Sequence, residues 1–236
     1  LRTSKFAMLL RRPWRRLFRR LEDHGIGPDH QLSFLRKARG IIHIGANVGQ
    51  EAWIYSLMGK RVIWFEPIPK VYQKLCENLS KYPKQRAFQE LIADKDGSAF
   101  IFKIANNDGE SSSIFDLALH REMYPEVDFV GSIDLRSKSL DGAMEFYGIS
   151  TSFDALVMDT QGSELLILKG AAGTLRRLRW IYLECADFSA YEGGCNCSEI
   201  AKLLKTEGFC EVTRYLKKSQ EGIGSYYDIL FERSPI

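Results

Sequence analysis

The chain has 236 residues, of which 45% are hydrophobic and 27% are charged, and this balance suits one globular α/β domain with a sizeable core. Residues 1–20 contain eight Lys and Arg residues and no acid, so subtracting these eight from the net charge of +3 leaves −5 for the rest. The basic character therefore belongs to the leading segment. No apolar stretch is long enough for a membrane-spanning helix, which excludes a protein built on such helices, and we expect a soluble cytoplasmic protein.

The five cysteines are an odd number and lack the spacing of a small secreted domain held by disulfides. They are Cys76, Cys185, Cys195, Cys197 and Cys210. Ordinary thiols in a reducing cytosol are the simpler interpretation. A metal site built on Cys195 and Cys197 with Cys185 nearby would lack a second close-spaced pair and a neighbouring histidine, so we predict no metal there.

The first 40 residues are predicted to form a basic helical extension ahead of a domain that spans residues 41–236. Pro13 suits the first turn of a helix, and an apolar face then lies opposite the arginines. This face consists of Trp14, Leu17, Phe18 and Leu21. One interpretation is an interfacial helix over residues 1–21 that contacts a membrane surface, a partner or nucleic acid. The other, which we favour, is a capping helix packed on the domain.

The stretch from Ile41 to Gln50 combines a strand, a turn and the start of a helix. An apolar run of strand length stops at Gly45, and a helical pattern begins after the turn. Gly45 lets the backbone approach a ligand, Asn47 tolerates a left-handed conformation, and Gly49 lets the helix lie close to the strand. The candidate ligand contacts are His43, Gly45, Ala46, Asn47 and Gly49.

A second strand, Arg61–Phe65, is followed directly by the carboxylate of Glu66. Glu66 lies 21 residues after Gly45, where an acid at the end of the next parallel strand reaches the two hydroxyls of a bound ribose. The pattern therefore predicts a ligand that contains adenosine. The glycine spacing is G-x-N-x-G and not the G-x-G-x-x-G of dinucleotide-binding folds, which favours S-adenosylmethionine over NAD.

The middle of the chain is predicted from alternation and turn residues. Ala87–Ile92 is expected to form a third strand and Ala99–Ile104 another. Residues 106–113 include no apolar side chain, so their composition predicts a surface loop. A helix-like pattern over Phe115–Met123 carries His120, and a lone histidine on a helix is more often a surface residue than a catalytic one.

Two carboxylates end two later strands. The strand Phe153–Asp159 ends in Asp159, and the strand Leu178–Leu183 is followed by Glu184. Ligands of open parallel sheets collect at the carboxyl ends of the strands, so both acids are predicted to face one cleft. Asp159 can favour a sulfonium charge and accept a proton from an attacking hydroxyl, with a helix N-cap role also open. We predict Asp159 and Glu184 as the catalytic pair.

Two residues near these acids have structural or functional interpretations. Glu164 begins a helix, where an acid complements the helix dipole without any catalysis, and we slightly favour that structural role. Tyr191 starts a glycine-rich loop that could close over a substrate.

The remaining elements complete the sheet. Phe129–Ser137 is predicted to be a strand, and Ser139 to cap the helix after it. Asn196 with Glu199 three residues later resembles a capping box. After the helix that follows, two strands, 209–216 and 226–231, should pair as a hairpin. The alternation of strands and helices predicts an α/β fold with a doubly wound, mostly parallel sheet and an antiparallel C-terminal hairpin.

Four short motifs occur in order along the chain. They are Gly45–Gly49, Phe65–Pro67, Glu110–Ser113 and Met158–Glu164, the last followed by Leu168–Ala171. Together they resemble the motifs of FkbM-type methyltransferases, from about Ile41 to the C-terminus, and the last is the most specific. The chain departs from the family at His43, where members usually have an acid. The resemblance implies a Rossmann-like class I methyltransferase fold with S-adenosylmethionine as cofactor.

The resemblance also implies roles for residues of the middle segment. In methyltransferases of this general fold the end of the third strand lies beside the adenine, which points to Ile92 and Asp94, although Asp94 is as readily a turn-former. The serine-rich segment faces the active site in the family, which implies cofactor or substrate contacts for Ser112 and Ser113. The remaining candidate substrate contacts are His120 and Tyr191.

The implied activity is transfer of a methyl group to a hydroxyl of a glycan, such as a polysaccharide, or of a small molecule. Paired carboxylates suit Mg²⁺, so a bridging metal at Asp159 and Glu184 is compatible with the sequence but not required by it. The alternatives are RNA ribose methylation with the arginine-rich arm and a non-catalytic cofactor-binding partner. Nucleic acid is the less favoured substrate, because no Pro-Cys pair occurs and Asp159–Gly162 lacks the prolines of amino-group DNA methyltransferases.

Overall fold

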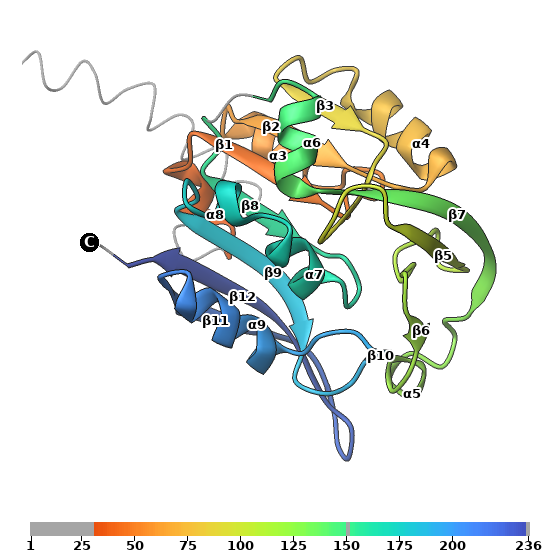
Figure 1. The fold of residues 1–236 in the computed structure, drawn as a ribbon. Coiled ribbons are helices and arrows are strands. Elements are labelled where there is room, and N and C mark those ends of the chain that lie inside the picture. Colours follow the sequence, from red (N-terminus) through yellow and green to blue (C-terminus); the bar gives the residue numbers. More distant parts are fainter. Residues whose placement is uncertain (1–30, 150–151, 235–236) are drawn as a thin grey trace, which may run out of the picture.

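The computed structural model describes residues 31–149 and 152–234 (Figure 1). The basic extension, with the helix expected over residues 1–21, lies outside the described residues. In the part of the chain that is described, no helix is long and apolar enough to cross a membrane.

A seven-stranded sheet forms the centre of the molecule. From one edge to the other its strands are β3 (Gln85–Phe88), β2 (Arg61–Phe65), β1 (Gly40–Ile44), β8 (Ala155–Met158), β9 (Trp180–Ala186), β12 (Gly224–Arg233) and β11 (Phe209–Gln220). The five strands from β3 to β9 are parallel, and β12 runs antiparallel to both β9 and β11. The predicted doubly wound sheet with an antiparallel C-terminal hairpin is therefore confirmed.

The strand order reverses at β1, because the chain extends from it toward β3 and later returns to its other side with β8. All residues of β1 and β8 are buried, as expected for strands covered on both faces. Their register places His43 between Trp64 of β2 and Val157 of β8. This reversal of strand order leaves a crevice at the carboxyl ends of β1 and β8.

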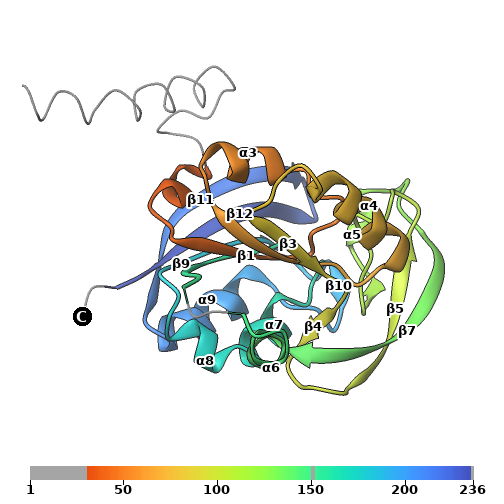
Figure 2. The same cartoon turned by 90° about the horizontal axis from the view of Figure 1, so that it is seen from above.

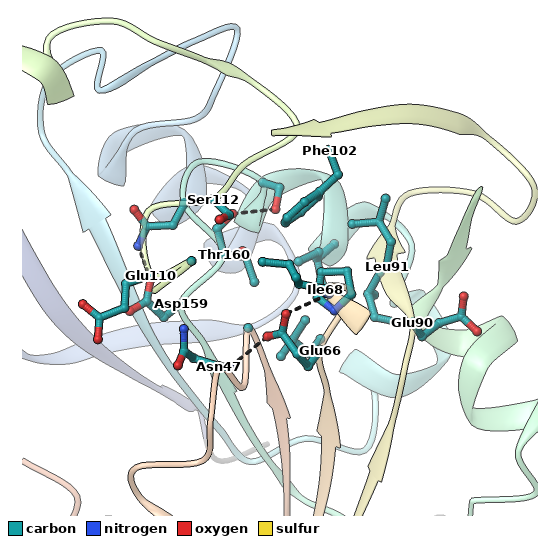
Figure 3. Close-up of a pocket in the computed structure, with 18 residues that line it drawn as sticks. Asn47, Glu66, Ile68, Glu90, Leu91, Phe102, Glu110, Ser112, Asp159 and Thr160 are labelled. Carbon is teal, nitrogen blue, oxygen red and sulfur yellow. Dashed lines mark hydrogen bonds between the residues drawn. The ribbon is translucent and has the colours of Figure 1, made fainter. Parts of the chain in front are cut away.

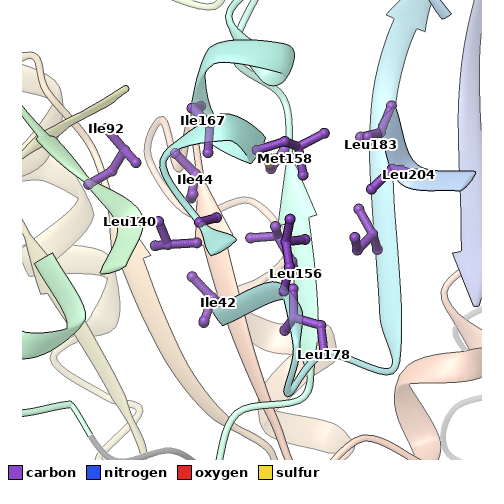
Figure 4. Close-up of a cluster of buried hydrophobic side chains, with 14 of the residues drawn as sticks. Ile42, Ile44, Ile92, Leu140, Leu156, Met158, Ile167, Leu178, Leu183 and Leu204 are labelled. Atoms are coloured by element: carbon purple, nitrogen blue, oxygen red, sulfur yellow. The ribbon is translucent and has the colours of Figure 1, made fainter. Parts of the chain in front are cut away.

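Helices cover both faces of the sheet (Figure 2). One face carries η1 (Ser33–Arg36), α3 (Ala52–Leu57) and α4 (Pro69–Leu79), and the other α6 (Leu140–Phe146), α7 (Glu164–Lys169), α8 (Ala172–Leu175) and α9 (Cys197–Thr206). Each face has its own buried apolar cluster. In the second of these layers, Ile167 of α7 lies over Ile44 and Met158 of the central strands (Figure 4).

A second, three-stranded sheet is inserted between β3 and β8. Its order is β4 (Leu91–Ala93), β7 (Phe129–Ser139) and β5 (Ala99–Ala105). The predicted hairpin strand at Ala99–Ile104 is confirmed, because β5 pairs antiparallel with β7. The single strand expected over Ala87–Ile92 is wrong: the chain leaves the main sheet after Phe88, and Leu91 and Ile92 pair with Ser137 and Lys138 instead.

The helix expected over Phe115–Met123 is also corrected. Only α5 (His120–Met123) is helical, and β6 (Asp116–Leu117) pairs with β10 (Tyr191–Glu192). The tertiary pairing with the loop after β9 overrides the local helical pattern.

Both predicted helix caps are confirmed. Ser139 Oγ accepts a hydrogen bond from Gly142 N at 3.0 Å. Asn196 Oδ1 accepts from Glu199 N at 3.1 Å, while Glu199 Oε2 accepts from Asn196 N at 3.0 Å, which completes the capping box.

The expectation of ordinary thiols is wrong for one pair of cysteines. Cys185 of β9 and Cys197 of α9 form a disulfide with a Cα–Cα distance of 5.4 Å. Cys76, Cys195 and Cys210 are free. The sequence spacing did not indicate the pair, because the loop between β9 and α9 folds back to bring the two residues together. The disulfide also removes one support for the expected reducing compartment.

Candidate active site

The turns after β1 and β8 approach each other closely at the crevice. Gly45 has a φ of +78°, and a Cβ atom on it would lie 1.8 Å from the carbonyl oxygen of Asp159. The backbone N–H of Asp159 donates to the carbonyl of Ile44 at 3.2 Å. Only glycine allows this contact, which brings the first motif and the candidate base together.

Glu66 joins the turn after β1 to the turn after β2. Its carboxylate accepts hydrogen bonds from Asn47 N and Ile68 N, both at 2.9 Å (Figure 3). Asn47 has the left-handed conformation that the sequence suggested, with a φ of +44°. Burial raises the pKa of Glu66 to about 7, although the two backbone hydrogen bonds oppose that rise.

A first cavity opens beside Glu66. Its apolar lining includes Ile68, Leu91 and Phe102, which Figure 3 shows around the carboxylate, together with Ile44, Ile92 and Ile167. Apolar walls beside the buried carboxylate of Glu66 suit a nucleoside, because the base can pack between apolar side chains while its ribose hydroxyls donate to the acid. We therefore name it the nucleoside cavity.

Two predicted cofactor contacts lie elsewhere. Asp94 is not among the residues that line the nucleoside cavity, and its backbone carbonyl packs against Gly170. Gly49 packs against α4, since a Cβ atom on it would lie 2.7 Å from a methyl group of Leu75. Ile92, in contrast, lines the cavity as expected from the third strand.

A second cavity of about 500 Å³ adjoins the first. Its walls include His43, Ala46, Ser111, His120 and Tyr124, with Glu184 and Lys217 on the side of β9 and β11. We name it the acceptor cavity. Gly45, Asn47, Glu110, Asp159 and Gln161 line both cavities. A group bound in one cavity would therefore face a group bound in the other across Asp159.

A chain of hydrogen bonds orients Asp159. Gln161 Nε2 donates to Asp159 Oδ1 at 2.5 Å, and the Tyr191 hydroxyl donates to Gln161 Oε1 at 2.5 Å. Burial raises the pKa of Asp159, whereas Lys217 and Gln161 lower it. A carboxylate with a raised pKa is a better proton acceptor near neutral pH than an exposed aspartate.

Glu184 lies beside Asp159 but has a cationic partner. Lys217 Nζ forms an ion pair with Glu184 Oε2, and lies 3.9 Å from Asp228. Burial raises the pKa of Glu184 to about 8, the charge of Asp159 adds to that rise, and Lys217 opposes it. Burial lowers the pKa of Lys217, but the three surrounding carboxylates raise it above its usual value, so Lys217 stays charged.

The surface loop expected over residues 106–113 is wrong for its three serines, although Asn106, Asp108 and Glu110 are exposed. Ser111 and Ser112 are each 7% exposed and Ser113 is 1% exposed. Ser112 lines the nucleoside cavity and accepts from Ala105 N at 3.0 Å. Ser113 Oγ donates to the carbonyl of Gln161 at 2.8 Å. Their hydroxyls satisfy backbone groups, so polar residues can be buried here.

Two buried histidines line the acceptor cavity, and the surface position expected for His120 is wrong. His120 Nδ1 lies 2.6 Å from the Tyr226 hydroxyl, and its ring packs between Tyr124 and Tyr191. His43 stacks on Trp64 with 4.5 Å between the ring centroids. Burial lowers the pKa of His120 to about 4 and that of His43 to about 3, so both are neutral at pH 7.

The structural interpretation of Glu164 is confirmed. Its carboxylate accepts from Thr160 N and Thr160 Oγ1 at 2.9 Å and from Gly162 N at 3.1 Å. It therefore holds the turn that presents Asp159 and Gln161.

The sequence reasoning missed several residues of this site, among them Gln161 and Lys217. Gln161 belongs to the last motif, and its left-handed φ of +53° marks a turn that glycine usually occupies. Glu51, Tyr124 and Lys217 line the acceptor cavity without any local signal. Within residues 31–149 and 152–234, no group of three or more His, Cys, Asp or Glu side chains could hold a metal ion. The Mg²⁺ bridge that the sequence allows at Asp159 and Glu184 therefore gains no support from the geometry.

Comparisons with known proteins agree on the family. A model of the methyltransferase FkbM domain matches residues 43–217. The chain is 31% identical over 172 residues to the 2-O-methyltransferase NoeI of Sinorhizobium fredii, which covers 70% of each protein.

Among solved structures, one similar to this chain is the magnesium protoporphyrin IX methyltransferase ChlM from Synechocystis PCC 6803 with bound SAM. The superposition covers 84% of this chain and 72% of ChlM, with 11% sequence identity and a TM-score of 0.49. Another is a 1,6-didemethyltoxoflavin-N1-methyltransferase from Burkholderia thailandensis. Its superposition covers 100% of this chain and 92% of that enzyme, with 12% sequence identity and a TM-score of 0.47. The family model and the curated relative each cover most of the chain, and it therefore belongs to the FkbM family of S-adenosylmethionine-dependent methyltransferases.

Proposed function

We propose that this protein transfers a methyl group from S-adenosylmethionine to a hydroxyl oxygen of a glycan or another small polyol. The observation that carries the proposal is the meeting of two cavities at Asp159, one suited to a nucleoside and the other lined by polar side chains. The relative named 2-O-methyltransferase supports oxygen as the accepting atom.

The residues around the nucleoside cavity fit the cofactor. Glu66 would accept hydrogen bonds from the ribose hydroxyls, and Ile68, Ile92 and Phe102 would pack on the adenine. The turn from Gly45 to Asn47 lines both cavities and would hold the methionine part. When bound, S-adenosylmethionine supplies a methyl carbon that its sulfonium charge has already activated.

Asp159 is the proposed proton acceptor. Among the described residues only its Oδ1 is hydrogen-bonded, which leaves Oδ2 to accept the proton of an acceptor hydroxyl. Glu184 is the proposed helper, because Lys217 binds it and holds a positive charge near Asp159. Much of the remaining task is to hold acceptor and donor in line, which restricted cavities achieve.

The two alternatives receive less support. RNA ribose methylation would require phosphate groups close to a site that carries several carboxylates. A non-catalytic cofactor binder would not need an oriented carboxylate between the two cavities. Contact of residues 1–21 with a membrane surface or a partner stays a prediction.

Calorimetric titration with S-adenosylmethionine, with NAD in parallel, tests the cofactor assignment. Glu66→Ala should weaken binding by at least about tenfold, the loss expected for one good hydrogen-bonding carboxylate. Asp159→Asn should bind normally but release at least about 10²-fold less S-adenosylhomocysteine with acceptors present, the range for a lost general base. Glu77→Ala, an exposed acid on α4, is the matched control. Normal cofactor binding by Glu66→Ala, or unchanged turnover by Asp159→Asn, would contradict the assignment.

A further inference from the structure

The acceptor cavity has an uneven charge. Five of its lining residues are acids, namely Glu51, Glu110, Glu126, Asp159 and Glu184, and Lys217 is its only Lys or Arg among the described residues. His43 and His120 add no charge at neutral pH, because burial keeps both neutral. In the described part of the chain, the acids of this lining therefore outnumber its one cation.

The acids of this cavity already repel one another. Burial raises the pKa of Glu51, and the charge of Asp159 raises it further. The pKa of Glu184 responds in the same way to burial and then to Asp159. The ammonium of Lys217 is committed to Glu184, so it is not free to pair with an anionic ligand. A further negative charge in this cavity would be opposed at short range.

The buried histidine His120 supplies no cation that could balance these acids. His120 is 3% exposed, lines the cavity, and has a buried Nε2 atom without a hydrogen-bond partner among the described residues. Its Nδ1 atom is taken by Tyr226. Because Nε2 is closed to solvent and the ring is neutral, His120 offers an anionic ligand neither a positive charge nor an accessible donor.

We infer that the acceptor is an uncharged polyol, and that the acidic walls exclude acceptors that carry a carboxylate, sulfate or phosphate near the reacting hydroxyl. This inference rests on the proposed function. It deepens that function by naming a charge class for the substrate. Glu110 and Glu126 are the two exposed acids of this lining, and we call them its rim acids.

Matched acceptor pairs test the inference. The full chain, saturated with S-adenosylmethionine, is given p-nitrophenyl glycosides of neutral hexoses, each beside its uronic acid and its sulfate ester, and methylated products are measured by mass spectrometry. For each glycoside that is methylated, the kcat/KM of the neutral form should be at least about tenfold higher than that of its uronic acid or sulfate ester. A roughly tenfold difference corresponds to the effect of one modest charge interaction. Added salt should narrow the difference, because mobile ions screen charges at the rim.

Charge reversal at the rim provides the second arm. The double variant Glu110→Lys with Glu126→Lys should raise the ratio of anionic to neutral transfer by at least about tenfold. Glu122→Lys, an exposed acid of α5 outside the lining of the cavity, should leave that ratio unchanged. Glu110→Gln with Glu126→Gln removes the charges with less disturbance and should move the ratio in the same direction.

The outcomes separate the inference from the proposed function. The inference is overturned if anionic acceptors are methylated as fast as their neutral partners. It is also overturned if neither double variant changes the ratio of anionic to neutral transfer. Both results would leave hydroxyl methylation intact. An absence of methyl transfer to every member of the panel counts against the proposed function and against the inference that rests on it.

Discussion

Gln161 is the residue on which the geometry of the reaction centre depends most. Its φ of +53° is unfavourable for a residue with a side chain, and the hydrogen bonds around it keep it there. Ser113 holds its backbone carbonyl, Tyr191 its side-chain oxygen, and Asp159 receives its amide N–H. Tyr191 thus acts through Gln161 and helps to fix the orientation of the base.

Removal of the Tyr191 hydroxyl should change the pH dependence of catalysis. In Tyr191→Phe the Gln161 amide loses its partner and donates less well to Asp159, so the pKa of Asp159 should rise because the hydrogen bond that lowers it is weakened. A base must be ionised to act, so the acidic limb of the kcat/KM profile should move to higher pH. At neutral pH kcat should fall on the order of tenfold, and cofactor affinity should be unchanged.

The control for this prediction is Tyr227→Phe, which removes a hydroxyl bonded to Asp187 at 3.3 Å and not to Gln161. Its pH profile should match that of the wild type. An acidic limb that stays in place in Tyr191→Phe would show that the hydrogen-bond chain does not tune the base.

At the scale of elements, the turn after β1 and the turn after β8 depend on each other. Gly45 lies so close to the Asp159 carbonyl that no Cβ atom would fit between them. This backbone contact fixes the candidate base relative to the nucleoside cavity. Either turn alone would be a common strand–helix connection. Their contact at the crevice makes them one site.

Substitution of Gly45 should therefore lower the free energy of unfolding by more than its left-handed conformation alone would explain. Gly45→Ala is expected to lower the free energy of unfolding by at least about 3 kcal/mol and to abolish cofactor binding, because backbone must move to admit the methyl group. Gly59→Ala is the matched control, since Gly59 has a φ of +69° with no atom near its Cβ position. Gly59→Ala should lower the free energy of unfolding by only about 1 kcal/mol. Urea denaturation and calorimetry measure both effects, and equal losses in the two variants would contradict the argument.

The disulfide between β9 and α9 is a second link between elements. Cys185 follows Glu184 directly, and its bond to Cys197 closes a loop with a sequence separation of 12 that contains Tyr191. Closing a loop of this size restricts the unfolded chain, which corresponds to about 3 kcal/mol of stability. The loop that positions Gln161 is thereby anchored at both ends.

Loss of this disulfide should lower stability. Cys197→Ser is expected to reduce the free energy of unfolding by about 2–4 kcal/mol under oxidising conditions. Addition of dithiothreitol should destabilise the wild type but not that variant. Cys76→Ser, which alters an exposed free thiol on α4, should leave the stability unchanged. Equal stability of the wild type with and without dithiothreitol would contradict the prediction.

At the scale of the whole molecule, the elements that sequence reasoning found are those whose signals are local. The buried strands β1, β2, β8 and β9 are short apolar runs bounded by turn residues, and the helix caps at Ser139 and Asn196 each depend on residues within one turn. The split of the expected third strand and the pairing of β6 with β10 were missed, because strand partners distant in the chain decided them.

The candidate site divides in the same way. The sequence by itself determined the glycine turn, the acids Glu66 and Asp159 at the ends of parallel strands, and the family, because short-range spacing encodes all of these. Only the tertiary structure decided that the serine segment is buried, that Lys217 pairs with Glu184, that Cys185 bonds Cys197, and that the acceptor cavity is acidic. Those features depend on side chains brought together from separate elements, and no local pattern in the chain records which distant charges will share one cavity.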